Sequence, residues 1–123
     1  MKDIIVIDDD QIYCFVFETM IKRAAPLYKI KIFNNPIEAL APISKDGINP
    51  LTLILLDLNM PEMSGWDFLE QFEKLKIDCI GFIVTSSIDL VDKENANKYS
   101  LIKGFYSKPM TMEDLNIIVT KYG

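Results

Sequence analysis

Short runs of apolar residues alternate along this chain with longer segments whose apolar residues recur at helical spacing. Two of the runs, residues 4–7 and 51–56, consist almost wholly of Ile, Val and Leu and end at aspartates. Such continuous runs are typical of strands that are buried on both faces of a sheet. Weaker runs predict three more strands, at residues 30–33, 80–84 and 104–106.

The segments between these runs predict helices. Residues 11–25, which Pro26 follows, have the spacing of an amphipathic helix, and we expect a core-facing stripe of Ile12, Phe15, Val16, Met20 and Ala24. Capping residues mark the starts of four more helices, near Asn35, Ser64, Asp89 and Thr111. The helix that begins near Asp89 is expected to extend to about Tyr99.

Five strands that alternate with five helices predict an α/β fold with right-handed crossovers. At this length the compact solution is a (βα)5 doubly wound, five-stranded parallel sheet in the flavodoxin-like order 2-1-3-4-5, with helices on both faces. The sequence shows no internal repeat, low-complexity tract or linker, so we expect residues 1–123 to form a single domain. Ligands of such sheets bind at the carboxyl ends of the strands, here beside the first and third.

Composition excludes several functions. The 123 residues include no histidine, so the chain has no Ser/His/Asp triad, no His-liganded zinc and no phosphohistidine of its own. A net charge of −5 argues against direct nucleic-acid binding, which uses clustered Lys and Arg. No apolar stretch is long enough to span a membrane and no leader is evident, so we expect a cytoplasmic protein that binds no membrane. Cys14 and Cys79 are expected to be buried, reduced thiols.

Aspartates follow the first and third strands. Asp8, Asp9 and Asp57 should therefore meet at one edge of the sheet, where their like charges would favour a bound cation. Mg²⁺, which prefers carboxylate, carbonyl and water oxygens, is the natural candidate. An Asp-Asp-Asp run can also be a simple helix cap, but Asp57 comes directly after a buried strand. Thr85 and Lys108 end the fourth and fifth strands and could add a hydroxyl and a cation to the same edge.

At these positions the chain resembles the response-regulator receiver domains of two-component signalling. The resemblance covers nearly the whole chain and rests on four segments: IIVIDDD at 4–10, LLDLNMPEMSG at 55–65, VTS at 84–86 and KP at 108–109. Receivers share the strand order given above, so the order and the resemblance are not independent predictions.

The resemblance implies that Asp57 accepts a phosphoryl group from a phosphohistidine on a sensor histidine kinase or a histidine phosphotransfer protein. It implies Mg²⁺ bound by Asp9 and Asp57, by Asp8 through water, and by the backbone carbonyl of Asn59. The chain would be a phosphoacceptor that assists its own phosphorylation and dephosphorylation rather than an enzyme with a separate substrate.

The same resemblance gives Thr85 a bond to a phosphoryl oxygen and pairs Lys108 with Asp57 or its phosphoryl group. Phe105 stands where the family has an aromatic residue that changes rotamer when the threonine moves. Ser86 replaces a commonly smaller residue, and Asn59 and Ser87 occupy positions that tune the lifetime of the phosphate. The first helix docks the kinase in receivers, and here Tyr13 and Phe17 widen its apolar band.

Three alternatives compete with a receiver. A haloacid-dehalogenase-like phosphatase needs an Asp two residues after the nucleophile as acid and base, and here that residue is Asn59. A flavin mononucleotide site needs backbone N–H donors after the first strand, where this chain has three aspartates. A pseudo-receiver, which would act as a phosphorylation-independent interaction module, has the same fold and stays open.

Overall fold

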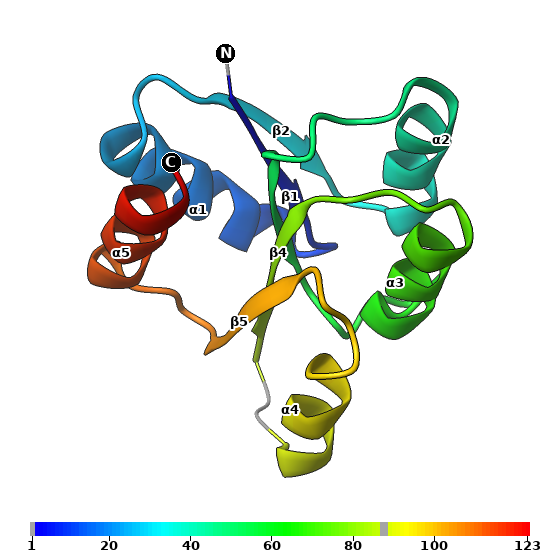
Figure 1. Cartoon of the computed structure of the whole chain (residues 1–123). Helices are drawn as coiled ribbons and strands as arrows, with labels where there is room; N and C mark the ends of the chain where they lie inside the picture. Colours follow the sequence, from blue (N-terminus) through cyan, green and yellow to red (C-terminus); the bar gives the residue numbers. More distant parts are fainter. Residues whose placement is uncertain (1, 87–88) are drawn as a thin grey trace.

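The computed structural model of the chain describes residues 2–86 and 89–123. Its central feature is one sheet of five strands in the order β2-β1-β3-β4-β5, with every neighbouring pair parallel (Figure 1). The strands are β1 Asp3–Ile7, β2 Lys29–Phe33, β3 Leu53–Leu56, β4 Ile80–Thr85 and β5 Ile102–Ser107. The predicted strand order and parallel pairing are confirmed.

In the part of the chain that the structure describes, five helices cover both faces of this sheet, as predicted. They are α1 Gln11–Ala24, α2 Pro36–Asp46, α3 Gly65–Lys74, α4 Leu90–Ala96 and α5 Met112–Tyr122. In Figure 1, α1 and α5 lie on one side of the sheet and α2 and α3 on the other. The predicted capping residues Asn35, Ser64, Asp89 and Thr111 each accept a backbone N–H bond in the first turn of their helix, which satisfies a donor that the helix leaves free.

The sheet separates two apolar cores. Successive side chains of a strand point to opposite faces, so Ile5 and Ile7 of β1 pack with α2 and α3, while Ile4 and Val6 pack with α1 and α5. All four residues of β3 are buried in the same alternating way. Burial of β1 and β3 on both faces confirms the interpretation of their continuous apolar runs.

The predicted core stripe of α1 is wrong at Ile12, Phe15 and Val16, whereas Met20 and Ala24 are partly buried and pack against the core. This helix buries Cys14, Phe17 and Ile21, whereas Ile12 is 80% exposed, Phe15 75% and Val16 52%. Apolar residues occupy most of the circumference of α1, so both sets fit a helical period, and packing against the sheet selects the one that the spacing alone did not.

Smaller differences concern the ends of two elements. Helix α4 ends at Ala96, three residues earlier than expected, because polar residues and a turn follow it. Strand β3 begins at Leu53 rather than at Leu51, which is exposed.

Within residues 2–86 and 89–123, no helix is both long and apolar enough to cross a membrane.

Both cysteines are free and buried, as predicted. Burial is the main cause that raises the pKa of the Cys14 thiol to about 11 and of the Cys79 thiol to about 12, with nearby Asp8 and Asp78 adding to the shifts. Since the thiolate is the reactive form, neither residue is a nucleophile near neutral pH.

Candidate functional site

The candidate site lies at the carboxyl edge of the sheet, where β1 and β3 end side by side. The N–H of Asp57 donates to the Ile7 carbonyl, and the N–H of Asp8 donates to the Phe33 carbonyl, both at 3.0 Å. These bonds continue the backbone pairing past the strand ends, so both aspartates lie at the same level along the carboxyl edge of the sheet. The sequence prediction that they meet is therefore confirmed.

Three carboxylates converge at this edge. Asp8, Asp9 and Asp57 each offer an oxygen within 4.8 Å of the others. Asp8 and Asp57 are buried, while Asp9 is exposed. A set of hard oxygen donors with one side open to water is the kind of site that a divalent cation such as Mg²⁺ occupies, because this ion keeps several of its waters. The residues present thus fit a bound metal ion.

Lys108 is the cation of this cluster. Its ammonium lies 2.6 Å from Asp8 Oδ2 and 3.5 Å from Asp57 Oδ2. The backbone N–H of Lys108 donates to the Thr85 carbonyl at 2.8 Å, which aligns the ends of β4 and β5. The Lys108–Pro109 peptide bond is cis. Burial opposes the charged form of the lysine, but the bonds to Asp8 and Asp57 outweigh it and raise the pKa of Lys108.

Asp57 has a perturbed carboxyl group. Burial first, and the charge of Asp8 second, raise the pKa of Asp57 to about 6, against the opposing effects of Lys108 and of the Asn59 N–H. This N–H donates to Asp57 Oδ1 at 3.4 Å. A perturbed carboxyl beside a cation at a strand end is a frequent feature of functional sites.

Asn59 also contacts Thr85 through its side chain, which the sequence did not indicate. Its amide Nδ2 donates to the Thr85 hydroxyl at 3.3 Å, and Thr85 is fully buried. The phosphatase alternative required an acid at position 59, and the amide there is engaged as a hydrogen-bond donor. Ser86 is exposed, and Ser87 lies outside the residues that the structure describes.

Asn34 is a member of the site that sequence reasoning missed. Its Nδ2 donates to the Asp8 carbonyl at 3.0 Å and contacts Cys14 Sγ at 3.5 Å. The amide thus supports the backbone that carries the acidic pair. A signal was present, because Asn34 directly follows the second strand as Asp8 follows the first, and these strands are neighbours in the predicted order.

Close packing supports the loop that leads from Asp57 to α3. The N–H of Gly65 donates to the Leu58 carbonyl at 2.9 Å. A Cβ atom at residue 65 would lie 2.7 Å from the Asp57 carbonyl oxygen and 2.9 Å from Leu58 Cα, so only glycine fits. Ser64 caps the helix that begins here. The strand end and the start of α3 are therefore fixed against each other.

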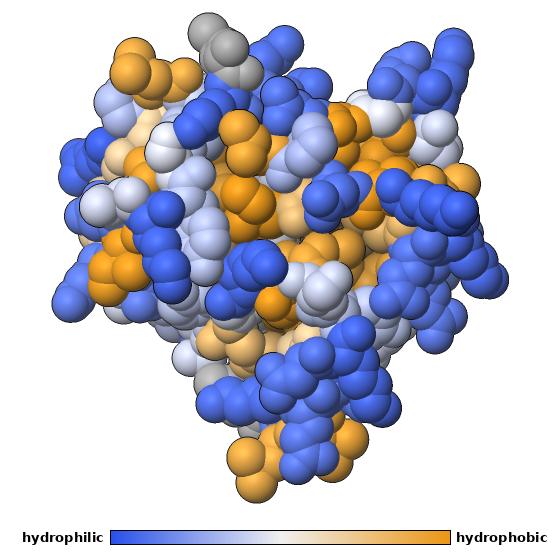
Figure 2. Space-filling view, in the orientation of Figure 1, coloured by the Kyte–Doolittle hydropathy of each residue, from blue (hydrophilic) through white to orange (hydrophobic). Residues whose placement is uncertain are grey.

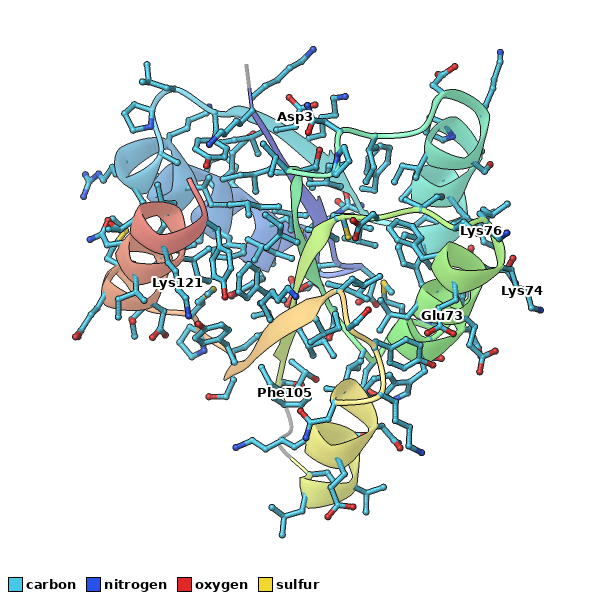
Figure 3. All side chains as sticks on the ribbon, viewed as in Figure 1. Asp3, Glu73, Lys74, Lys76, Phe105 and Lys121 are labelled. Carbon is cyan, nitrogen blue, oxygen red and sulfur yellow. The ribbon has the colours of Figure 1, made fainter. Side chains whose placement is uncertain are left out.

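The aromatic candidates have different surroundings. Phe17 is 1% exposed and packs in the core, so it offers no surface to a partner and its expected docking role is corrected. Tyr13 is half-buried, and its hydroxyl accepts a bond from the Met110 N–H at 3.3 Å. Phe105, labelled in Figure 3, is a half-buried residue of β5 that packs against the core beside α4.

The fold and the site together define a flavodoxin-like α/β protein with an acidic, lysine-containing site at the carboxyl edge of its sheet. Residues 4–120 match the family model of the response regulator receiver domain, so the chain belongs to this family of two-component signalling proteins. Receiver domains are phosphoacceptors that work with a phosphohistidine-bearing partner.

Solved structures of receivers are similar throughout. A two-component response regulator from Cytophaga hutchinsonii is 27% identical with a TM-score of 0.83, and covers 99% of this chain and 96% of its own. One from Legionella pneumophila is also 27% identical, with a TM-score of 0.82 and coverages of 99% and 98%. A CheY-like receiver domain protein from Methanospirillum hungatei, 24% identical with a TM-score of 0.82 and coverages of 98% and 92%, supports the fold alone.

The response regulator SaeR of Staphylococcus aureus is 24% identical over 118 residues, which are 94% of this chain and 47% of that protein. The chain thus spans about half the length of the curated relatives that it matches.

Proposed function

We propose that residues 1–123 form one receiver domain that accepts a phosphoryl group onto Asp57 in a Mg²⁺-dependent reaction and signals through protein contacts. The observation that carries this proposal is the buried Asp57 carboxylate, which has two further carboxylates within 4.8 Å and the Lys108 ammonium at 3.5 Å. The carboxylates of Asp8, Asp9 and Asp57 and the carbonyl of Asn59 would hold Mg²⁺, directly or through water, and the ion would neutralise charge on the transferred group.

In the proposed transfer, an Asp57 carboxylate oxygen forms a bond to phosphorus while the bond from phosphorus to the donor imidazole nitrogen breaks. The electron pair of the broken bond stays on the imidazole. Phosphoryl transfer gains little from covalent assistance, so alignment and charge neutralisation supply most of the rate. Lys108 contributes a positive charge beside the attacking oxygen, and Asp8 holds that lysine in place.

Phosphorylation would add about two negative charges and three acceptor oxygens next to Thr85. The Thr85 hydroxyl, which now accepts from the Asn59 amide, would then donate to a phosphoryl oxygen. Phe105 lies on β5, which pairs with β4, the strand that ends at Thr85. Phe105 is the residue that we expect to change rotamer. Leu90 and Val91, exposed in the first turn of α4, would offer apolar surface to a downstream protein. Figure 2 shows hydrophobic surface at the lower end of the molecule, where α4 lies in Figure 1.

The phosphoryl donor must lie outside residues 1–123, since they include no histidine. We propose a sensor histidine kinase or a histidine phosphotransfer protein as the partner. The exposed apolar residues of α1, which are Ile12, Phe15 and Val16, begin two residues after the N-cap Asp10 and so lie beside the acidic edge. They replace Phe17 as the surface that would dock a helical partner.

The proposal also covers the cellular location of the protein and its lack of contact with nucleic acids and membranes. The net charge of −5 favours protein contacts over direct nucleic-acid binding. Two free buried thiols suit a reducing compartment, and we place the protein in the cytoplasm, away from membranes.

Labelling with acetyl phosphate and Mg²⁺, followed by intact-mass measurement, tests the phosphoacceptor. We expect a mass gain of one phosphoryl group in the native protein and none in Asp57→Asn or in a Mg²⁺-free reaction. Asp46→Asn, a charge change on the exposed end of α2, is the matched control and should label normally. An adduct that persists in Asp57→Asn would place the acceptor elsewhere. No adduct from acetyl phosphate or from a phosphorylated histidine protein would favour the pseudo-receiver.

A further inference from the structure

The Lys108 ammonium touches an aromatic ring as well as two carboxylates. Its Nζ lies 4.8 Å from the centroid of the Tyr13 ring and 2.6 Å from Asp8 Oδ2. A cation within about 6 Å of a tyrosine ring face is attracted by the negative charge density there. The contact is worth more where water is excluded, and Lys108 is mostly buried.

Three further contacts hold Tyr13 in place. Its backbone N–H donates to Asp10 Oδ1 at 3.0 Å, as part of the cap of α1. Its ring lies 5.2 Å from that of the fully buried Phe17. Its hydroxyl accepts from the Met110 N–H at 3.3 Å, only two residues beyond Lys108. The tyrosine thus connects α1, the acidic edge and the segment that carries the lysine.

We propose that Tyr13 is a positioning residue for the phosphoryl transfer, acting through Lys108; this inference rests on the function proposed above. A lysine side chain is flexible and loses rotamer entropy when it is fixed. The ring beneath the ammonium reduces the conformations of that side chain, and the hydroxyl fixes the backbone that follows it. Lys108 is therefore already directed at Asp8 and Asp57 before a phosphoryl group arrives.

This role differs from partner docking in what it predicts. If Tyr13 only docked a kinase, its replacement would slow transfer from the kinase and leave labelling by a small phosphodonor unchanged. A positioning residue affects both reactions, because the small donor needs Lys108 as much as the kinase does. Acetyl phosphate, which has no docking surface, separates the two roles.

The kinetic test compares Tyr13→Leu, Tyr13→Phe and the control Tyr99→Leu. Tyr99 is also half-buried and stacked on an aromatic residue, Trp66, but it follows α4 in the chain and packs beside residues of α3. With acetyl phosphate and saturating Mg²⁺, we expect Tyr13→Leu to slow labelling about three- to thirtyfold. Tyr13→Phe, which keeps the ring, should slow it by no more than about threefold, and Tyr99→Leu should leave it unchanged.

A double-variant cycle shows whether the effect passes through the lysine. In a Lys108→Ala background, Tyr13→Leu should cause less than about a twofold further loss, because the group that it positions is gone. A Tyr13→Leu loss of the same size in both backgrounds would overturn the proposal, as would native labelling rates in Tyr13→Leu.

A second measurement does not depend on phosphorylation. The Lys108 side-chain protons nearest the ammonium should show an upfield ring-current shift in the NMR spectra of the native protein and Tyr13→Phe, and lose it in Tyr13→Leu. If that shift is present but no variant or native protein accepts a phosphoryl group, the proposed function fails while the contact stands. If Tyr13→Leu leaves the shift unchanged, the positioning role fails by itself.

Discussion

At the scale of single residues, the site has a charge imbalance that its own cation does not remove. Three carboxylates and one ammonium leave a net charge of −2 when all are ionised. Lys108 pairs most closely with Asp8, so Asp57 is the carboxylate that is left less well compensated. Burial is the main cause of the raised pKa of Asp57, and the charge of Asp8 adds to it against the opposing effect of Lys108. The uncompensated negative charge is also why a divalent cation suits the site.

The raised pKa of Asp57 predicts a pH dependence of stability in Mg²⁺-free protein. Its ordinary value is near 4 and its folded value about 6. Between these values the folded state binds more protons than the unfolded state, so the free energy of unfolding falls as pH rises, by at most roughly 3 kcal/mol. Urea unfolding in a chelator from pH 4 to pH 7 should therefore show Asp57→Asn gaining stability relative to the native protein up to about pH 6. A stability difference that stays constant over this range would contradict the raised pKa.

Some site residues could be predicted from the sequence and others could not. Asp8, Asp57, Thr85 and Lys108 directly follow or end strands, and parallel strands bring such positions together whatever the side chains do. The contacts of Tyr13 with Lys108 and Met110 depend instead on how α1 is rotated against the sheet. No spacing rule along one segment contains that rotation.

At the scale of elements, the strands and helix starts were predictable and the buried face of α1 was not. Strand β3, and β1 after Asp3, have apolar residues at every position, and the caps have a local hydrogen-bonding signal, so neither prediction depends on distant contacts. Helix α1 has two apolar stripes, and only the sheet decides which is buried. The stripe left exposed, which contains Ile12, Phe15 and Val16, has no structural reason to be apolar and is what a docking surface needs.

Paired substitutions on α1 test this assignment of faces. Phe15→Ser should change the free energy of unfolding by no more than about 0.5 kcal/mol, because the side chain is 75% exposed. Phe17→Ala, in the core, should destabilise the protein by about 3–5 kcal/mol. Urea unfolding followed by circular dichroism measures both. A larger loss of stability for Phe15→Ser than for Phe17→Ala would mean that the helix packs on the face predicted from its spacing. With a phosphohistidine donor, Phe15→Ser should also slow transfer while acetyl phosphate labelling is retained.

At the scale of the whole molecule, the sheet fixes the positions of the candidate site residues at its carboxyl edge. Two cores hold the strands from both faces, and so the strand ends that carry the acidic residues are fixed relative to one another. Because residues 1–123 include no histidine, the phosphoryl donor of the proposed function must lie outside them. Its net charge of −5 includes the excess of the site, and a bound divalent ion would remove that part.

Mg²⁺ should therefore stabilise the folded protein as a whole, because the unfolded chain does not hold the three carboxylates together. A concentration ten times the dissociation constant corresponds to about 1.4 kcal/mol, or a rise in Tm of roughly 4–8 °C for a chain of this size. Differential scanning calorimetry at pH 7.5 measures the shift. Asp9→Asn, which removes the exposed carboxylate of the cluster, should reduce it strongly, and Asp46→Asn should retain it. Equal shifts in both variants would show that Mg²⁺ binds somewhere other than the carboxyl edge of the sheet.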